Sequence, residues 1–142
     1  MEEKSRESMA EDLFRSGRNC SQSVFLAFAD RYGLDEGAAA KISCGLGGGV
    51  GRMREVCGAV TGASLLFGLE YGDDKAVVYG HVQEFCRRFR EACGSIVCRE
   101  LLDGTGAAAG GAPEERTSAY YAKRPCVEMV KLAARILTEM GL

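Results

Sequence analysis

The sequence is short of several features that define whole classes of protein. Its 142 residues carry 18 basic and 20 acidic side chains, and the two signs are mixed along the chain. A net charge of only −2 gives no strong field for attracting nucleic acid or an anionic membrane, so we expect neither as a partner. No stretch approaches the roughly eighteen apolar residues of a spanning helix, and no apolar segment of a secretion signal follows the charged start. We therefore expect a cytoplasmic protein.

Nucleotide-binding motifs are missing as well. The glycines between 45 and 51 do not make a dinucleotide fingerprint, because Val50 stands where a third glycine would be needed, and no Lys-Ser or Lys-Thr pair follows to make a phosphate-binding loop. The single histidine, His81, lies in a helical segment, and we interpret it as a partly exposed helical side chain rather than a base. Cysteine is what the chain does have. Seven cysteines in a cytosolic protein indicate redox-active, metal-binding or buried thiols rather than a framework of structural disulfides.

The hydrophobic pattern predicts helices throughout and no strand. A chain of this length typically forms one domain, so we expect residues 1–142 to fold as a single all-α helical bundle of about five to seven helices. Asn19, Asp35 and Asp74 are suitable N-caps, and Ser95 can cap a short helix. From Asp103 to Glu115 the chain has neither periodicity nor bulk, so we expect a mobile loop there. The expected helices cover residues 7–17, 20–33, 38–43, 54–71, 75–93, 96–102 and the segment from Pro125 onward.

The predicted helix over 54–71 is the centre of this arrangement. It is apolar on nearly all sides, which is typical of a buried helix. A tight turn that contains Gly47, Gly48 and Gly49 precedes it and delivers Cys57 to a fixed place. Gly58 and Gly62 are four residues apart, so they share a helix face and allow a neighbouring backbone to approach closely.

Four of the cysteines share a position within their helices. Cys20, Cys98 and Cys126 fall in the first turns of predicted helices, and Cys57 lies near the start of the central one. Helix N-termini present free N–H groups and the positive end of the helix dipole, which favour a thiolate over a thiol. A cysteine can also be merely a small buried hydrophobe, and Cys86 and Cys93 fit that interpretation because they share an apolar face seven residues apart. The four helix-start positions favour chemistry.

The segment Cys57-Gly58-Ala59-Val60-Thr61-Gly62 resembles the CGAxxG signature of the C_GCAxxG_C_C family of redox-active proteins, whose label transposes the first two letters. The order of the other features is also similar to that family: Cys20 upstream, then the glycine-rich turn, then Cys98 and Cys126 downstream. The resemblance covers nearly the whole chain. It implies a small helical protein with four functional cysteines and a redox role, and it implies no substrate.

Three functions are open to this sequence. In the first, two of the four thiols form a reversible disulfide, and the second pair passes electrons onward to a redox partner protein or a small thiol. We expect Cys57 to attack and Cys20 to be its first candidate partner, with Cys44 as a further candidate resolving thiol. We expect no cofactor for this first function.

In the second function, the same four cysteines ligate zinc or an iron–sulfur cluster, although their wide spacing lacks the close CxxC pairs that such sites commonly use. In the third, the domain is a non-catalytic interaction module with buried cysteines. The sequence leaves the oligomeric state and the disulfide connectivity open.

Overall fold

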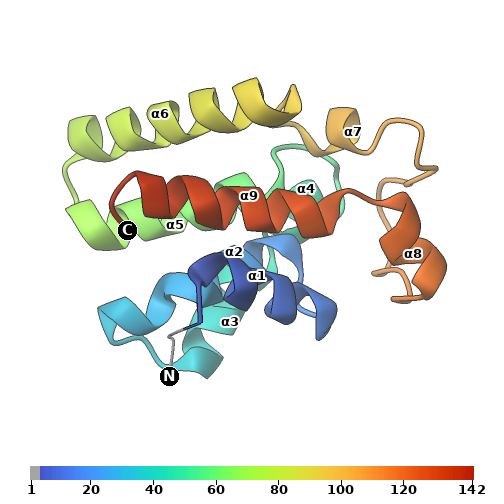
Figure 1. Cartoon of the computed structure of the whole chain (residues 1–142), viewed down its shortest axis with the longest axis horizontal. Coiled ribbons are helices and arrows are strands. Elements are labelled where there is room, and N and C mark those ends of the chain that lie inside the picture. The colour runs from blue at the N-terminus through green and yellow to red at the C-terminus, as the bar shows by residue number, and fades with distance from the viewer. Residues whose placement is uncertain (1–3) are drawn as a thin grey trace.

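A computed structural model describes residues 4–142 and shows an all-α fold, as expected (Figure 1). Its main helices are α1 (Arg6–Arg15), α2 (Cys20–Ala29), α3 (Glu36–Cys44), α5 (Gly58–Tyr71), α6 (Lys75–Cys93), α8 (Ser118–Lys123) and α9 (Cys126–Glu139). Two four-residue segments, α4 (Gly47–Val50) and α7 (Cys98–Leu101), and the 3₁₀ turn η1 (Asp30–Tyr32) complete it. In the part of the chain described, the only β-type pairing is an isolated bridge between Val56 and Val97.

The helices pack in layers around α2, α5 and α9. Helix α5 packs on α2, α9 packs on both, and α6 covers the outer side of α5 and α9. On the opposite side, α1 and α3 lie against α2 (Figure 1). The largest fully buried side chains come from all three layers and include Phe14, Phe25, Phe28, Phe67, Phe85 and Phe89. Segments α4, α7 and α8 gather at the end of the bundle where α2, α5 and α9 begin (Figure 1).

The predicted N-caps explain why the helices begin where they do. Asn19 forms a capping box with Gln22 at the start of α2, and its side-chain oxygen accepts from the Gln22 amide over 2.9 Å. Asp35 and Asp74 cap α3 and α6 in the same way, each through a carboxylate that accepts from backbone amides. Gly94 then ends α6 in the left-handed conformation. These predictions are confirmed.

The close packing of α5 on α2 depends on glycine, as the sequence predicts. A Cβ atom on Gly62 would lie 2.7 Å from the carbonyl oxygen of Ser21, and one on Gly58 would lie 3.0 Å from the Ser21 amide nitrogen. Both partners are backbone atoms of α2 that cannot move independently of the helix. Glycine at these positions therefore fixes how closely the two helices approach.

Two predicted helix starts are wrong. Residues 54–57 are not helical, because their backbone forms hydrogen bonds with residues 96–99, and α5 begins only at Gly58. Ser95 does not cap α7. Its hydroxyl accepts from the Val97 amide and pairs with Glu100, and Val97 occupies the cap position of a shorter helix.

Helix α8, absent from the prediction, begins directly after Thr117, whose hydroxyl accepts from the Tyr120 amide. Its six residues are too few to show a helical period. The segment between α7 and α8 contains no helix, in line with the expected loop.

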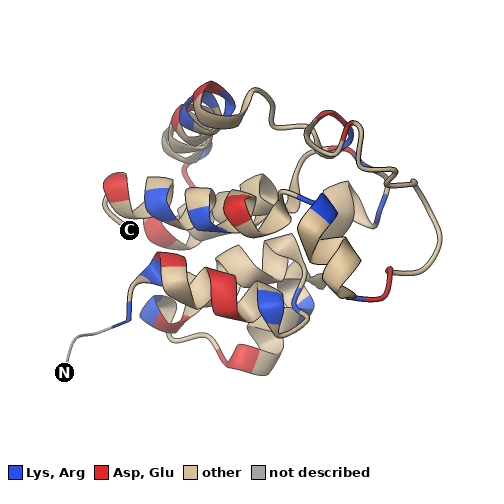
Figure 2. Cartoon of the chain, turned by 45° about the vertical axis from the view of Figure 1, so that its right-hand side comes forward, with Lys and Arg blue, Asp and Glu red and all other residues tan. Residues whose placement is uncertain are grey.

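Charged side chains of both signs are spread over the outer surfaces of the helices (Figure 2). Many of them pair within or between helices, as in the contacts of Arg87 with Glu84 and Glu91 along α6. Within residues 4–142, no helix combines the length and the apolar character needed to cross a membrane.

Candidate functional site

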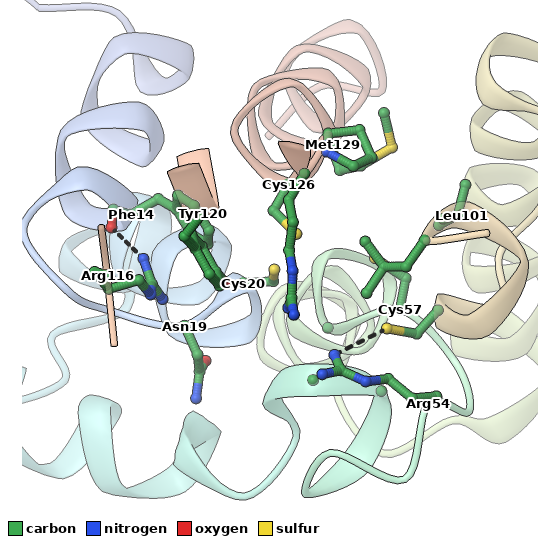
Figure 3. A pocket seen from close by; sticks show the side chains of 17 residues that line it. Phe14, Asn19, Cys20, Arg54, Cys57, Leu101, Arg116, Tyr120, Cys126 and Met129 are labelled. Atoms are coloured by element: carbon green, nitrogen blue, oxygen red, sulfur yellow. Dashed lines mark hydrogen bonds between the residues drawn. The ribbon is translucent and has the colours of Figure 1, made fainter. Parts of the chain in front are cut away.

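The four helix-start cysteines line one cavity of about 60 Å³ at the end of the bundle where α4, α7 and α8 gather (Figure 3). Cys20, Cys98 and Cys126 are the first residues of α2, α7 and α9, and Cys57 is the N-cap of α5. All four are free thiols. Cys57, Cys98 and Cys126 are buried, and Cys20 is partly exposed. The predicted helix-start positions are confirmed, and residues distant in the sequence share one site.

Two packing arrangements bring these cysteines together. The contact of α5 with α2 places Cys20 beside the start of α5, where a Cβ atom on Gly58 would lie 3.0 Å from the Cβ of Cys20. Cys57 and Cys98 reach the cavity through the two segments that meet at the Val56–Val97 bridge. The Cys57 amide donates to the Ile96 carbonyl over 2.8 Å, and the Cys98 amide donates to the Glu55 carbonyl over 2.6 Å.

The glycine-rich turn forms one wall of the cavity through an unusual run of backbone conformations. Gly48, Gly49 and Gly51 have positive φ, and so do the non-glycine residues Val50 (64°), Arg52 (65°) and Arg54 (59°). Left-handed backbone is costly for residues with a Cβ atom, so this run stores strain that the surrounding structure must hold. The buried Gly49 is also in close contact, because a Cβ atom there would lie 2.6 Å from the Cβ of Cys98. The turn therefore sets the position of Cys98.

Cys20 and Cys126 interact directly. Their sulfurs lie next to each other at the centre of the site (Figure 3). A hydrogen bond from the Cys20 thiol lowers the pKa of Cys126, and the positive charges of Arg124, Arg116 and Arg54 lower it further. The same hydrogen bond, together with burial, raises the pKa of Cys20 well above its ordinary value. The pair thus combines a Cys126 thiol that ionises more readily than usual with a neighbouring Cys20 thiol that holds its proton more tightly.

Cys57 and Cys98 have different environments. Burial raises the pKa of Cys57 to about 12, although the backbone amides of Ala59 and Val60 partly oppose it. Burial also raises the pKa of Cys98, and the guanidinium of Arg54, whose Nη1 donates to Cys98 Sγ over 3.7 Å, partly offsets that rise. The sequence favours Cys57 as the attacking thiol with Cys20 as its partner, whereas these surroundings favour Cys126 with Cys20.

Three arginines that the sequence analysis did not single out surround the sulfurs. Arg54 is 6% exposed, and the Arg124 side chain is 7% exposed. Arg116 packs its guanidinium over the rings of Phe14 and Tyr120, 4.3 and 4.9 Å from their centroids. Each arginine stands alone in a turn or loop with no periodic pattern to mark it. The one signal in the sequence is that Arg124 lies two residues before Cys126.

The remaining cysteines lie elsewhere. Cys44 is exposed at the end of α3 and lines a neighbouring hollow rather than the four-cysteine cavity. Cys86 and Cys93 lie on α6 and pack against the core, as the sequence suggests, and Cys93 Sγ donates to the Phe89 carbonyl over 3.0 Å. His81 is half-buried on α6 and stacks on Tyr71 with 3.8 Å between ring centroids.

The cavity has the donor type that zinc and iron–sulfur clusters use, four cysteine sulfurs. Their arrangement is less suited to a shared ion. Within residues 4–142, no three side chains of histidine, cysteine, aspartate or glutamate come close enough together to hold a metal. A disulfide needs only two sulfurs, and Cys20 and Cys126 are the two cysteines of the cavity whose side chains interact through a hydrogen bond.

Comparison with models of protein families gives a match over most of the chain. The family model described as "Putative redox-active protein (C_GCAxxG_C_C)" matches residues 18–140, a range that includes all four cysteines of the cavity. No curated protein and no solved structure matches the chain.

Proposed function

Since the chain belongs to the C_GCAxxG_C_C family of redox-active proteins, we propose that its redox chemistry is thiol/disulfide exchange at Cys126 and Cys20. The observation that carries the proposal is the hydrogen-bonding interaction of these two side chains in a cavity lined by two further cysteines and three arginines. Cys126 at the first position of α9 also faces free backbone N–H groups and the positive end of a fourteen-residue helix.

The exchange proceeds in two steps. The Cys126 thiolate attacks one sulfur of a substrate disulfide, the substrate S–S bond breaks, and one substrate thiolate leaves. Cys20 then gives up its proton and attacks the Cys126 sulfur of the mixed disulfide, which releases the second substrate thiolate. Two protein thiols are oxidised to one protein disulfide, and one substrate disulfide is reduced to two thiols.

The second pair has a separate part in this proposal. Cys57 and Cys98 directly follow the two residues of the Val56–Val97 bridge and line the same cavity. Both are buried with raised pKa values, so both stay protonated while Cys126 reacts. They would take over the oxidising equivalents by exchange with the Cys20–Cys126 disulfide and return the first pair to its reduced form.

The test is thiol counting with mapping of the bonds formed. The reduced protein has seven thiols, and treatment with a mild disulfide oxidant should remove two or four of them, with a Cys20–Cys126 linkage in the peptide map. Cys126→Ser should abolish the fast phase of thiol oxidation, whereas the matched variant Cys86→Ser on α6 should keep that phase. Oxidation that spares Cys20 and Cys126, or that is equally fast in both variants, would contradict the proposal.

Elemental analysis of the same preparations separates this function from metal binding. A stoichiometric amount of zinc or iron that is lost in Cys126→Ser would favour the cysteine-ligated metal instead. An interaction module would show neither the metal nor a specific linkage.

A further inference from the structure

A second hollow, of about 270 Å³, adjoins the cysteine cavity and shares part of its wall. The shared wall includes the side chains of Arg54, Arg116 and Arg124, and the hollow adds Arg52 from the glycine-rich turn. Glu114, from the loop before α8, is the one acidic residue that lines it. Its volume suits a small molecule rather than a folded partner.

The positive charge of this hollow is largely uncompensated. Arg52 and Arg124 share the carboxylate of Glu114, at 3.5 Å from Arg52 and in direct contact with Arg124. For Arg54 and Arg116, the residues of 4–142 supply no carboxylate within 4.0 Å. Four guanidinium groups therefore face one carboxylate, in a chain whose net charge is −2.

Neutral acceptors hold the unpaired guanidiniums in place. Arg116 donates to the carbonyl oxygens of Phe14 and Arg18 over 2.9 and 3.0 Å, and Arg54 Nε donates to the Ala108 carbonyl over 3.0 Å. These bonds fix the positions of the charges without cancelling them. Little ordering of side chains then remains to be done when an anion arrives. The Glu114 carboxylate already lies between Arg52 and Arg124, which demonstrates that a carboxylate fits there.

We propose that this arginine-lined hollow binds a small disulfide that carries carboxylate groups and presents its sulfurs to the Cys20–Cys126 pair. The inference rests on the proposed thiol/disulfide function and specifies its substrate class. The carboxylates pair with Arg52, Arg54, Arg116 and Arg124, and one of them takes the place of the Glu114 side chain. The bound disulfide is reduced to two carboxylate-bearing thiols, while Cys20 and Cys126 are oxidised to a disulfide.

The first experiment measures the electrostatic potential in the hollow and involves no redox step. Iodoacetate and iodoacetamide alkylate thiolates by the same reaction, but only iodoacetate is an anion. The ratio of their rates at Cys126, divided by the same ratio in the urea-unfolded chain, reports the local potential. We expect this normalised ratio to be about 10 at low salt and to fall at high salt, because several unpaired positive charges act across a partly solvated cavity.

Charge variants identify the source of that field. Arg52→Gln should lower the normalised ratio about threefold and Glu114→Gln should raise it about threefold, whereas Arg88→Gln on α6 removes the same charge outside the hollow and should leave it unchanged. Because the two site variants act in opposite directions, a general loss of folding cannot imitate the result. A ratio near one, or equal ratios in all the variants, would overturn the inference.

The second experiment uses substrates of opposite charge. 3,3′-Dithiodipropionate carries two carboxylates and cystamine carries two ammonium groups, and the reduced protein is offered each in turn. Faster oxidation of the Cys20–Cys126 pair by dithiodipropionate, with the preference reduced in Arg52→Gln, supports the inference. Equal rates with both disulfides would leave thiol exchange standing and refute the anionic substrate. Failure of both to oxidise the pair would refute the proposed function and the inference together.

Discussion

Alanine at Gly49 and at Gly51 should destabilise the protein to clearly different extents. Both glycines have left-handed backbone, with φ of 70° and 56°, so each alanine costs about 1 kcal/mol of backbone strain. At Gly51 the new Cβ atom has only the Gly45 carbonyl oxygen within 4 Å, at 3.9 Å, which is an ordinary contact. At Gly49 it would lie 2.6 Å from the Cβ of Cys98 and 2.7 Å from the Glu55 amide nitrogen.

Overpacking of this kind typically adds 1–3 kcal/mol, roughly, so we expect about 3 kcal/mol for Gly49→Ala and about 1 kcal/mol for Gly51→Ala. For a chain of this size, each kcal/mol lowers the melting temperature by roughly 4 °C. Thermal unfolding of both variants, followed by circular dichroism under reducing conditions, should therefore separate them by roughly 8 °C. If the two variants melt together, the glycine-rich turn does not position Cys98 by contact, and the geometry described for this wall of the cavity is wrong.

Three further predictions concern residues that line the site. Cys57, with its pKa raised to about 12, keeps its proton in the folded state where the unfolded chain loses it, so above pH 9 the free energy of unfolding should fall by up to about 1.4 kcal/mol per pH unit. Denaturant unfolding between pH 9 and 11 should show a shallower decline in Cys57→Ala, and parallel curves would contradict the assignment. Asn19→Ala removes the capping box of α2 and the hydrogen bond to the Cys44 carbonyl, so the free energy of unfolding should fall by about 1 kcal/mol. An unchanged midpoint in equilibrium unfolding would contradict this prediction. Oxidation of Cys20 and Cys126 closes a loop of about a hundred residues and should stabilise the protein by about 5 kcal/mol in denaturant. A lower midpoint after oxidation would show that the two sulfurs cannot bond without distortion.

The sequence predicts the fold well where local chemistry decides it. Asn19, Asp35 and Asp74 act as caps because a short polar side chain satisfies the free amides of a helix start in almost any tertiary setting. The spacing of Gly58 and Gly62 identifies the face of α5 that approaches α2 for an equally local reason, since only glycine presents no Cβ atom. The helix-start positions of the cysteines follow from these boundaries.

Prediction is poorer where distant segments meet. Residues 54–57 read as the first turn of a helix, but they form hydrogen bonds with residues 96–99 instead, and no local pattern announces that pairing. The interaction of Cys126 with Cys20 is equally nonlocal, and it depends on α9 packing across α1 and α2. For the same reason, the arginines of the site are visible only after the chain has folded, because each belongs to a separate turn or loop.

The route of the chain between α7 and α8 has a consequence for how the protein could be divided. This irregular connection returns to the first helix, where Arg116 holds the carbonyls of Phe14 and Arg18, and α9 then packs along α1. A backbone break near Gly110 would give two pieces that share an extensive apolar interface and would reassemble without a covalent link. Three of the four cavity cysteines would lie on one piece and Cys126 on the other, so neither fragment alone would hold both Cys20 and Cys126. Recombining the fragments would restore it, which makes this fold a natural starting point for a split protein whose activity reports association.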